Sequence, residues 1–145
     1  MRRVEAEALV GASRDEVWEL FDDIAGMPRW LPRVRTVSSV SGPAHVGTVY
    51  RERTSLLGIP GTRDWEIVEH RRPARQVRVA FDGGLERALI LTLEARGTGT
   101  RVSAEVELRS SLPMPLSLLH EMLATFPAGW TARGLVQATK RAFEG

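Results

Sequence analysis

Residues 12–34, ASRDEVWELFDDIAGMPRWLPRV, contain a short helix that ends before a tryptophan held between two prolines. Ser13 and Glu16 have the spacing of a capping box, in which each side chain caps the backbone N–H of the other residue. Gly26 favours the end of the helix, because glycine enters the left-handed cap conformation without steric cost. The second proline disfavours helical angles at the residue before it. The stretch therefore predicts one amphipathic helix, followed by a single helical turn that carries Trp30.

The apolar residues of this helix follow the spacing i, i+3, i+4 and i+7, which places them on one face. We expect that face to be buried and the charged face to be exposed. The expected buried residues are Val17, Leu20, Phe21 and Ile24, and the expected exposed residues are Asp15, Glu19 and Asp22.

Strands are predicted on both sides of the helical stretch. Residues 3–10 place valine or alanine at every second position, which is typical of a half-buried strand. Further on, stretches rich in valine, threonine and aromatic residues alternate with turn sequences such as DGG (82–84). Their hairpin-length connections predict sequential antiparallel pairing. The six predicted strands are 33–40, 47–56, 62–70, 76–81, 85–95 and 100–109.

A helical period returns after residue 115 and continues to about residue 143. Pro127 lacks a backbone N–H, so we expect a kink, or two helices of which the second begins near this proline. Segment 113–126 resembles a membrane-surface helix in its apolar content, but it has no basic residues to attract anionic lipid. Core packing and cavity lining are therefore favoured. The residues near one face are Leu116, Leu119, Leu123, Phe126 and Trp130.

The order of elements predicts an α+β fold in a single domain, residues 1–145. A seven-stranded antiparallel sheet has an apolar face to cover, and only the C-terminal helix is long enough to cover it. The expected architecture is a curved sheet wrapped around that helix, with two short helices after the first strand. Such an arrangement leaves a space between sheet and helix that side chains alone do not easily fill.

Four stretches of the chain match a known family pattern: residues 12–34, VGTVYR (46–51), the tryptophan of RDWEIVE (63–69), and GTGTRVSAEVEL (97–108). Together they make the whole chain resemble the helix-grip superfamily called SRPBCC or START-like, in particular its bacterial polyketide cyclase/dehydrase-like branch. The resemblance implies a cavity for a polyketide-like or lipid-like molecule and no cofactor. The matching motifs describe a fold and carry no catalytic residue with them.

Composition excludes several classes of function. The chain has no cysteine, which excludes disulfides, thiolate catalysis and cysteine-bearing zinc sites. Its net charge is only +2, and basic and acidic residues are interspersed, which argues against a nucleic-acid partner. No run approaches the ~20 apolar residues of a membrane span, and the first residues lack the apolar core of a signal peptide. We therefore expect a cytoplasmic protein without integral membrane association.

The histidines do not suggest a metal site. His45, His70 and His120 are spread over a loop, a strand end and a helix. His120 follows Leu119 and would suit proton transfer if it faced the cavity. The alternative, which is favoured, is a histidine on the flank of the helix, in solvent or bonded to a neighbour.

Strand parity predicts polar residues for the cavity. If Trp65 faces inward, Arg63 shares its face, and an inward Tyr50 brings Glu52 with it. An apolar pocket raises the pKa of a carboxylate, so Glu52 is a candidate acid or base, and Arg63 is placed to pair with it or to hold a ligand oxygen. A slip of one residue turns all of them outward, onto a solvated strand face. The candidate catalytic residues are Glu52, Arg63, Tyr50 and His120.

Apolar and aromatic residues from separate elements are predicted to wall the cavity. Phe81 is included because Val77, Val79 and Phe81 form the apolar half of an alternating strand. For Trp30 a second interpretation stays open, in which it plugs the edge of the sheet as part of the core. The predicted ligand-binding residues are Trp30, Tyr50, Trp65, Phe81, Leu119, Leu123 and Trp130.

Three functions remain open at this point. The first is binding of an apolar, ring-containing small molecule, and the second is a cofactor-free cyclase or dehydratase that acts on such a molecule. These two differ in whether at least two candidate catalytic residues converge in one cavity. The third is a protein-interaction module, which requires an open groove with an exposed apolar rim. The sequence predicts no oligomeric state.

Overall fold

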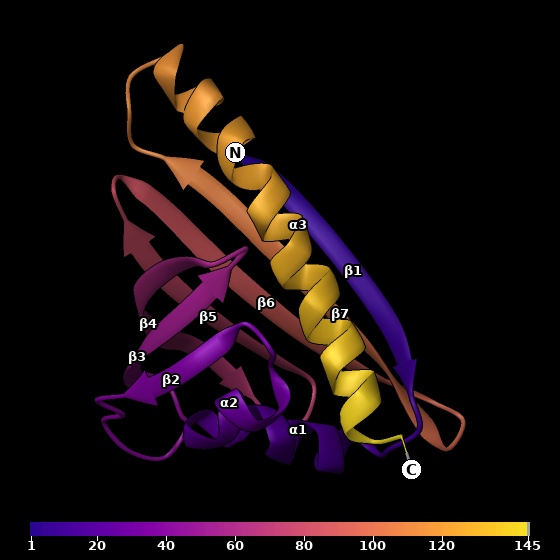
Figure 1. The fold of residues 1–145 in the computed structure, drawn as a ribbon. Coiled ribbons are helices and arrows are strands. Elements are labelled where there is room, and N and C mark those ends of the chain that lie inside the picture. Colours follow the sequence, from indigo (N-terminus) through magenta and orange to yellow (C-terminus); the bar gives the residue numbers. More distant parts are fainter. Residues whose placement is uncertain (145) are drawn as a thin grey trace.

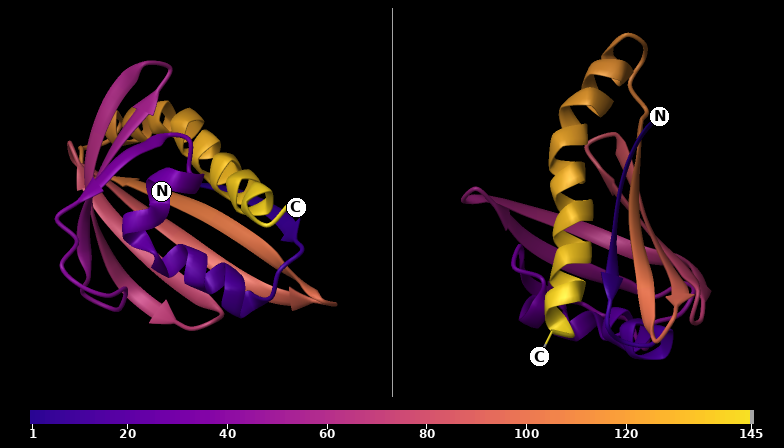
Figure 2. Two further views of the ribbon diagram at one scale, coloured as in Figure 1. Left: turned by 60° about the horizontal axis from the view of Figure 1, so that its bottom comes forward. Right: turned by 90° about the vertical axis from the view of Figure 1, so that its right-hand side faces the viewer.

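A computed structural model describes residues 1–144 of the chain, and it confirms the predicted fold class. One antiparallel sheet curves around the long C-terminal helix, and the short helices close one end of the sheet (Figures 1 and 2). The elements are β1 (Arg2–Val10), α1 (Arg14–Asp22), the 3-10 helix η1 (Ile24–Gly26), α2 (Met27–Trp30), β2 (Val34–Ser38), β3 (Val49–Leu56), β4 (Ile59–Arg71), β5 (Arg75–Asp82), β6 (Leu85–Arg96), β7 (Gly99–Ser110) and α3 (Leu116–Ala142).

The sheet has the strand order β1-β7-β6-β5-β4-β3-β2. Strands β2 to β6 each pair with the next strand in the chain, as their short connections predict. β1 pairs instead with β7, from Arg2 opposite Leu108 to Val10 opposite Thr100. The first and last strands of the chain therefore lie side by side (Figure 1).

The capping box at the start of α1 is confirmed, since Ser13 and Glu16 cap each other's backbone N–H. Three details of this helix differ from the prediction. Asp22, expected to be exposed, is half-buried. Leu20 is only half-buried, whereas Trp18 is fully buried against the sheet side of the helix. Gly26 has φ −85° and is not a left-handed cap; it is confined because a Cβ there would lie 2.1 Å from Oδ2 of Asp23.

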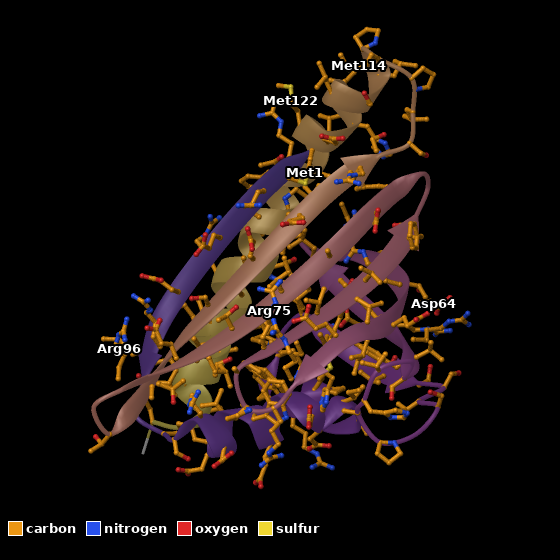
Figure 3. The ribbon with its side chains drawn as sticks, turned by 180° about the vertical axis from the view of Figure 1, so that it is seen from behind. Met1, Asp64, Arg75, Arg96, Met114 and Met122 are labelled. Atoms are coloured by element: carbon orange, nitrogen blue, oxygen red, sulfur yellow. The ribbon has the colours of Figure 1, made fainter. Side chains whose placement is uncertain are left out.

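The inward face of the sheet matches the predicted parity in β1, β3 and β4 and is reversed in β5. In β5 the buried residues are Gln76, Arg78 and Ala80, while Phe81 is 72% exposed on the outer face. That outer face carries charged side chains, of which Asp64 and Arg75 are visible in Figure 3, and Arg51 donates to Asp64 at 2.8 Å. The predicted inward position of Phe81 is therefore wrong.

Helix α3 runs through Pro127 without interruption, so of the two expected outcomes, a kink or two helices, the second is wrong. A proline removes only one helix hydrogen bond, and the turns on both sides continue the helix. The second half of α3 approaches the sheet through small residues such as Ala128, Gly129 and Ala132. The start of α3 extends beyond the sheet (Figure 1). In its first half Glu121 is buried and accepts a hydrogen bond from the backbone N–H of Ser110 in β7, while Leu119, Leu123 and neighbouring apolar residues are exposed.

No helix in the described part of the chain combines the length and apolar character that a membrane crossing requires.

Candidate functional site

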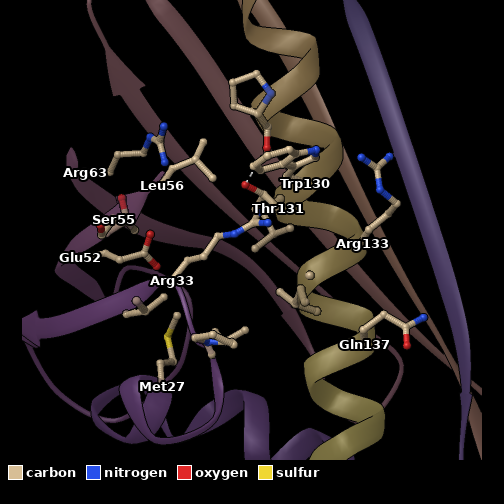
Figure 4. Close-up of a pocket in the computed structure, with 18 of the residues that line it drawn as sticks. Met27, Arg33, Glu52, Ser55, Leu56, Arg63, Trp130, Thr131, Arg133 and Gln137 are labelled. Carbon is tan, nitrogen blue, oxygen red and sulfur yellow. Dashed lines mark hydrogen bonds between the residues drawn. The ribbon is translucent and has the colours of Figure 1, made fainter. Parts of the chain in front are cut away.

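A cavity of about 530 Å³ lies between the second half of α3 and the part of the sheet formed by β3 and β4 (Figure 4). The segment after α2, Leu31–Val34, borders it next to β3. This volume is within the range of small-molecule sites. Its apolar lining includes Met27, Leu31, Leu56, Trp65, Leu89 and Trp130.

Three of the four candidate catalytic residues line this cavity: Tyr50, Glu52 and Arg63. Tyr50 lies directly opposite Trp65 in the β3–β4 pair, and Glu52 lies opposite Arg63. Because alternate residues of a strand share a face, the inward position of Trp65 brings the other three with it. The predicted parity of these two strands is therefore correct.

Glu52 is a buried carboxyl group, only 8% exposed. The indole Nε1 of Trp65 donates to its Oε1 over 3.4 Å, which is a long hydrogen bond. Burial raises the pKa of Glu52, and the positive charge of Arg63 only partly opposes this rise. The described residues show no hydrogen bond or ion pair between Glu52 and Arg63, although the two lie opposite each other. Glu52 therefore holds its proton to a higher pH than an ordinary glutamate.

Tyr50 contacts the buried side chain of Arg78. The alternation in β5 predicts this arginine on the outer face of the sheet. Nη1 of Arg78 donates to the Tyr50 hydroxyl over 3.0 Å, and Nη2 donates to the backbone carbonyl of Phe21 over 2.7 Å. Burial raises the pKa of Tyr50, so the phenol stays protonated. Because the hydroxyl oxygen of Tyr50 already accepts a hydrogen bond from Arg78, the hydroxyl proton is free to be donated to a ligand oxygen.

Arg78 and Gln76 are the residues that sequence reasoning missed. Nε of Arg78 donates to Oε1 of Gln76 over 2.8 Å, and Nε2 of Gln76 donates to Asp22 over 3.3 Å. Alternation in β5 shows that the strand has two different faces, but it does not show which one is inward. The signal in the sequence was the regular alternation of the polar residues of β5. In the structure these residues are buried, and the charged one donates to uncharged oxygen acceptors.

Five predicted site residues lie outside the cavity, one of which, Trp30, is described below. His120 shares a hydrogen bond of 2.8 Å with Ser110 at the end of β7, as the favoured helix-flank interpretation predicts. Leu119 is 54% and Leu123 70% exposed. Phe81 points away from the cavity because the opposite half of β5 faces inward. The predicted cavity positions of Leu119, Leu123 and Phe81 are therefore wrong.

Trp30 packs in the core and is not one of the cavity-lining residues. Its ring stacks on Phe21 with centroids 5.9 Å apart and an interplanar angle of 25°. The prolines on both sides hold it against α1, so the core interpretation of Trp30 describes its position. The neighbouring Arg33 instead extends toward the cavity and covers the Trp130 ring at 4.9 Å (Figure 4).

The histidines are accounted for by local partners. His45 bonds with Thr48, and Nε2 of His70 lies 2.9 Å from Oδ1 of Asp22. Within residues 1–144, no group of three His, Cys, Asp or Glu side chains is arranged to hold a metal ion.

Comparison with known proteins gives a consistent result. A sequence model of the family described as "Polyketide cyclase / dehydrase and lipid transport" matches residues 1–144. A crystal structure of a Thermus thermophilus protein is similar with a TM-score of 0.77 and 18% identity, over 97% of this chain and 95% of that one. The Zhui aromatase/cyclase of a Streptomyces species is similar with a TM-score of 0.76 and 15% identity, over 97% and 92%.

A START superfamily protein from Mycobacterium smegmatis is also similar, with a TM-score of 0.71 and 14% identity, over 97% of this chain and 98% of that one. No curated protein sequence matches the chain. At these identities the structural similarity establishes a shared fold.

Proposed function

The chain belongs to the polyketide cyclase / dehydrase and lipid transport family, and from this membership we propose that it binds an apolar, ring-containing small molecule in the cavity between the sheet and α3. The observation that carries the proposal is the cavity of about 530 Å³ with Trp65 on one side and Trp130 on the other. A hydrophobic small molecule is the kind of ligand that the family description implies.

The two tryptophans favour a ligand with flat rings. Large planar side chains bury much apolar area while they lose few rotatable bonds, so they bind planar molecules at a low entropic cost. They come from different elements, β4 and α3, which allows a ring to lie between them. Tyr50 and Glu52 supply the few polar groups that orient a ligand in such a pocket.

The test is a titration with 1-pyrenebutanol, a flat uncharged molecule, followed by tryptophan fluorescence. We expect saturable quenching, and we expect Trp65→Ala to weaken binding by about tenfold or more, because it removes the largest aromatic wall on the sheet side. Phe81→Ala is the matched control, since it removes an exposed aromatic residue on the opposite side of the sheet. The proposal fails if quenching does not saturate, or if both variants weaken binding equally.

A second candidate function is a cofactor-free cyclase or dehydratase. It is favoured by the convergence of Tyr50, Glu52 and Arg63 in one cavity. Ring closure between two carbonyl groups begins with removal of a proton from the carbon next to one of them. The Glu52 carboxylate is the candidate base for this proton, and the Tyr50 hydroxyl and the Arg63 guanidinium are placed to donate to the carbonyl oxygen on which negative charge develops.

In this mechanism the enolate carbon forms a bond to the second carbonyl carbon. The protonated Glu52 then returns its proton to the resulting alkoxide, which becomes a hydroxyl group. For loss of water, the Glu52 carboxylate removes the second proton from the same carbon and delivers it to this hydroxyl group, which leaves as water while a C=C double bond forms. Glu52→Gln would therefore abolish turnover and leave affinity within several-fold, because glutamine keeps the shape and cannot take the proton. If the variant keeps its turnover, Glu52 is not the base.

A further inference from the structure

Arg63 and Arg87 face the same end of the cavity from two strands. A small annex of about 20 Å³ adjoins the main cavity next to Pro127, and both arginines line it together with Trp65. In the sheet, Ala80 lies between Trp65 on β4 and Arg87 on β6. Ala80 is itself buried, so a small side chain separates these two residues in the sheet.

Among the described residues, each guanidinium group has a buried nitrogen that makes no hydrogen bond. These atoms are Nε of Arg63 and Nη1 of Arg87, and the latter has one long ion pair, 3.5 Å from Oδ2 of Asp82. Buried polar atoms in proteins are nearly always hydrogen-bonded, and an unpaired buried charge is more costly than an unpaired neutral group. Two such atoms in the residues that line one annex indicate that acceptors are supplied by a ligand.

The carboxylates of the protein do not balance these two charges. Glu52 lies opposite Arg63 without an ion pair, and burial favours its neutral form. Oδ2 of Asp82 lies 3.5 Å from Nη1 of Arg87, but the Asp82 side chain is 54% exposed and therefore largely solvated. Burial and the charge of Arg63 lower the pKa of Arg87 to about 10. This end of the cavity therefore carries excess positive charge when it is empty.

We propose that the ligand of this cavity carries a carboxylate, which Arg63 and Arg87 bind in the annex while Trp65 and Trp130 contact its rings. The planar guanidinium matches a carboxylate in shape and can donate two hydrogen bonds to it. This inference rests on the proposed function, because it concerns one end of a bound apolar molecule.

The experiment compares 1-pyrenebutyric acid with 1-pyrenebutanol at pH 7.5. The two probes share the ring system and the linker, and they differ in whether the linker ends in a carboxylate or a hydroxyl group. We expect the unmodified protein to bind the acid about tenfold more tightly, as a charge-assisted hydrogen bond provides. We also expect added NaCl to weaken binding of the acid and to leave binding of the alcohol unchanged.

Arg63→Gln and Arg87→Gln each should bring the ratio of the affinities for the acid and the alcohol close to one, mainly by weakening binding of the acid. Arg53→Gln is the matched control, because Arg53 is exposed on the opposite face of β3 and does not line the cavity. It should change neither affinity. Removal of one of two adjacent buried positive charges should also leave the melting temperature of the ligand-free protein equal or higher.

The possible results separate the two proposals. Equal, saturable affinities for both probes overturn the carboxylate inference and leave the proposed function intact. Absence of binding by both probes overturns the proposed function, and the inference with it. A preference for the acid that survives in both arginine variants shows that the carboxylate binds elsewhere. If a variant fails to fold, the two probes and the salt titration on the unmodified protein still test whether the cavity prefers a carboxylate.

Discussion

Burial of the Glu52 carboxyl group affects how the free energy of unfolding depends on pH. Its pKa is raised in the folded protein, mainly by loss of water. Between the ordinary pKa and the raised one, the folded state keeps a proton that the unfolded state has released. The free energy of unfolding therefore falls as pH rises through this interval, by up to about 1.4 kcal/mol per pH unit, and becomes constant above the raised pKa.

Glu52→Gln removes this decline, because glutamine does not titrate. We expect the variant to gain stability relative to the unmodified protein as pH rises above the ordinary glutamate range, in urea denaturation at a series of pH values. Glu66→Gln is the control, since Glu66 is exposed on the outer face of β4. A difference between Glu52→Gln and the unmodified protein that is constant with pH would show that Glu52 titrates normally.

Arg78 is a buried charge whose role is to join elements. It bonds the carbonyl of Phe21 in α1, the side chain of Gln76 and the hydroxyl of Tyr50 in β3. Arg78→Leu would leave at least two of these buried acceptors without a donor, at about 1–3 kcal/mol each. We expect a loss of about 2–6 kcal/mol in the free energy of unfolding, measured by urea denaturation. A loss below about 1 kcal/mol would mean that water replaces the guanidinium.

At the scale of elements, β5 is a strand whose inward face does not follow from its alternating sequence. The strand boundaries, the pairing order and the inward faces of β3 and β4 follow from local patterns and turn spacing. The alternation in β5 predicts that its hydrophobic half, which includes Val77 and Phe81, faces inward. In the structure this half faces outward. The deciding contacts of Arg78 come from α1 and β3, which are distant in sequence, so no local pattern contains them.

Helix α3 shows a related limit. Its apolar spacing is regular, and this predicts one buried face along the whole helix. Whether that face is covered depends on which side of the helix meets the sheet. In the first half of α3, Ser117 and Glu121 are buried, while Leu119 and Leu123 are exposed. Three of the four polar candidates line the cavity because strand parity is local, whereas His120 takes the favoured helix-flank position, bonded to Ser110.

Pro127 provides a prediction at the scale of the helix. Proline inside a helix costs about 3 kcal/mol relative to alanine, because it removes a hydrogen bond and crowds the preceding turn. Pro127→Ala should therefore raise the free energy of unfolding, by up to about 3 kcal/mol. Thermal unfolding followed by circular dichroism measures this change. A lower stability would show that the packing of the proline ring beside Trp130 outweighs the missing hydrogen bond.

At the scale of the whole molecule, a ligand in the cavity contacts both the sheet and α3. It therefore stabilises the folded state and not the unfolded chain. At a ligand concentration about a hundred times the dissociation constant, the gain is about 2.7 kcal/mol. For a chain of this size it corresponds to a rise of about 5–10 °C in melting temperature. We expect this rise with 1-pyrenebutanol and a clearly smaller one in Trp65→Ala. Fluorescence quenching without any rise would indicate that the probe also binds the unfolded chain.

The pairing of β1 with β7 also determines the order in which the molecule is assembled. β1 is synthesised first, but its partner is the last strand to leave the ribosome, and α3, which packs against β1, follows later still. The sheet from β2 to β7 is built from consecutive hairpins, whereas the pairing of β1 with β7 closes a loop of residues 11–99. Loop closure over such a distance has a high entropic cost and slows folding. We therefore expect β1 to be the last strand to reach its final position, and α3, which packs on β1 and β7, to complete the cavity with it.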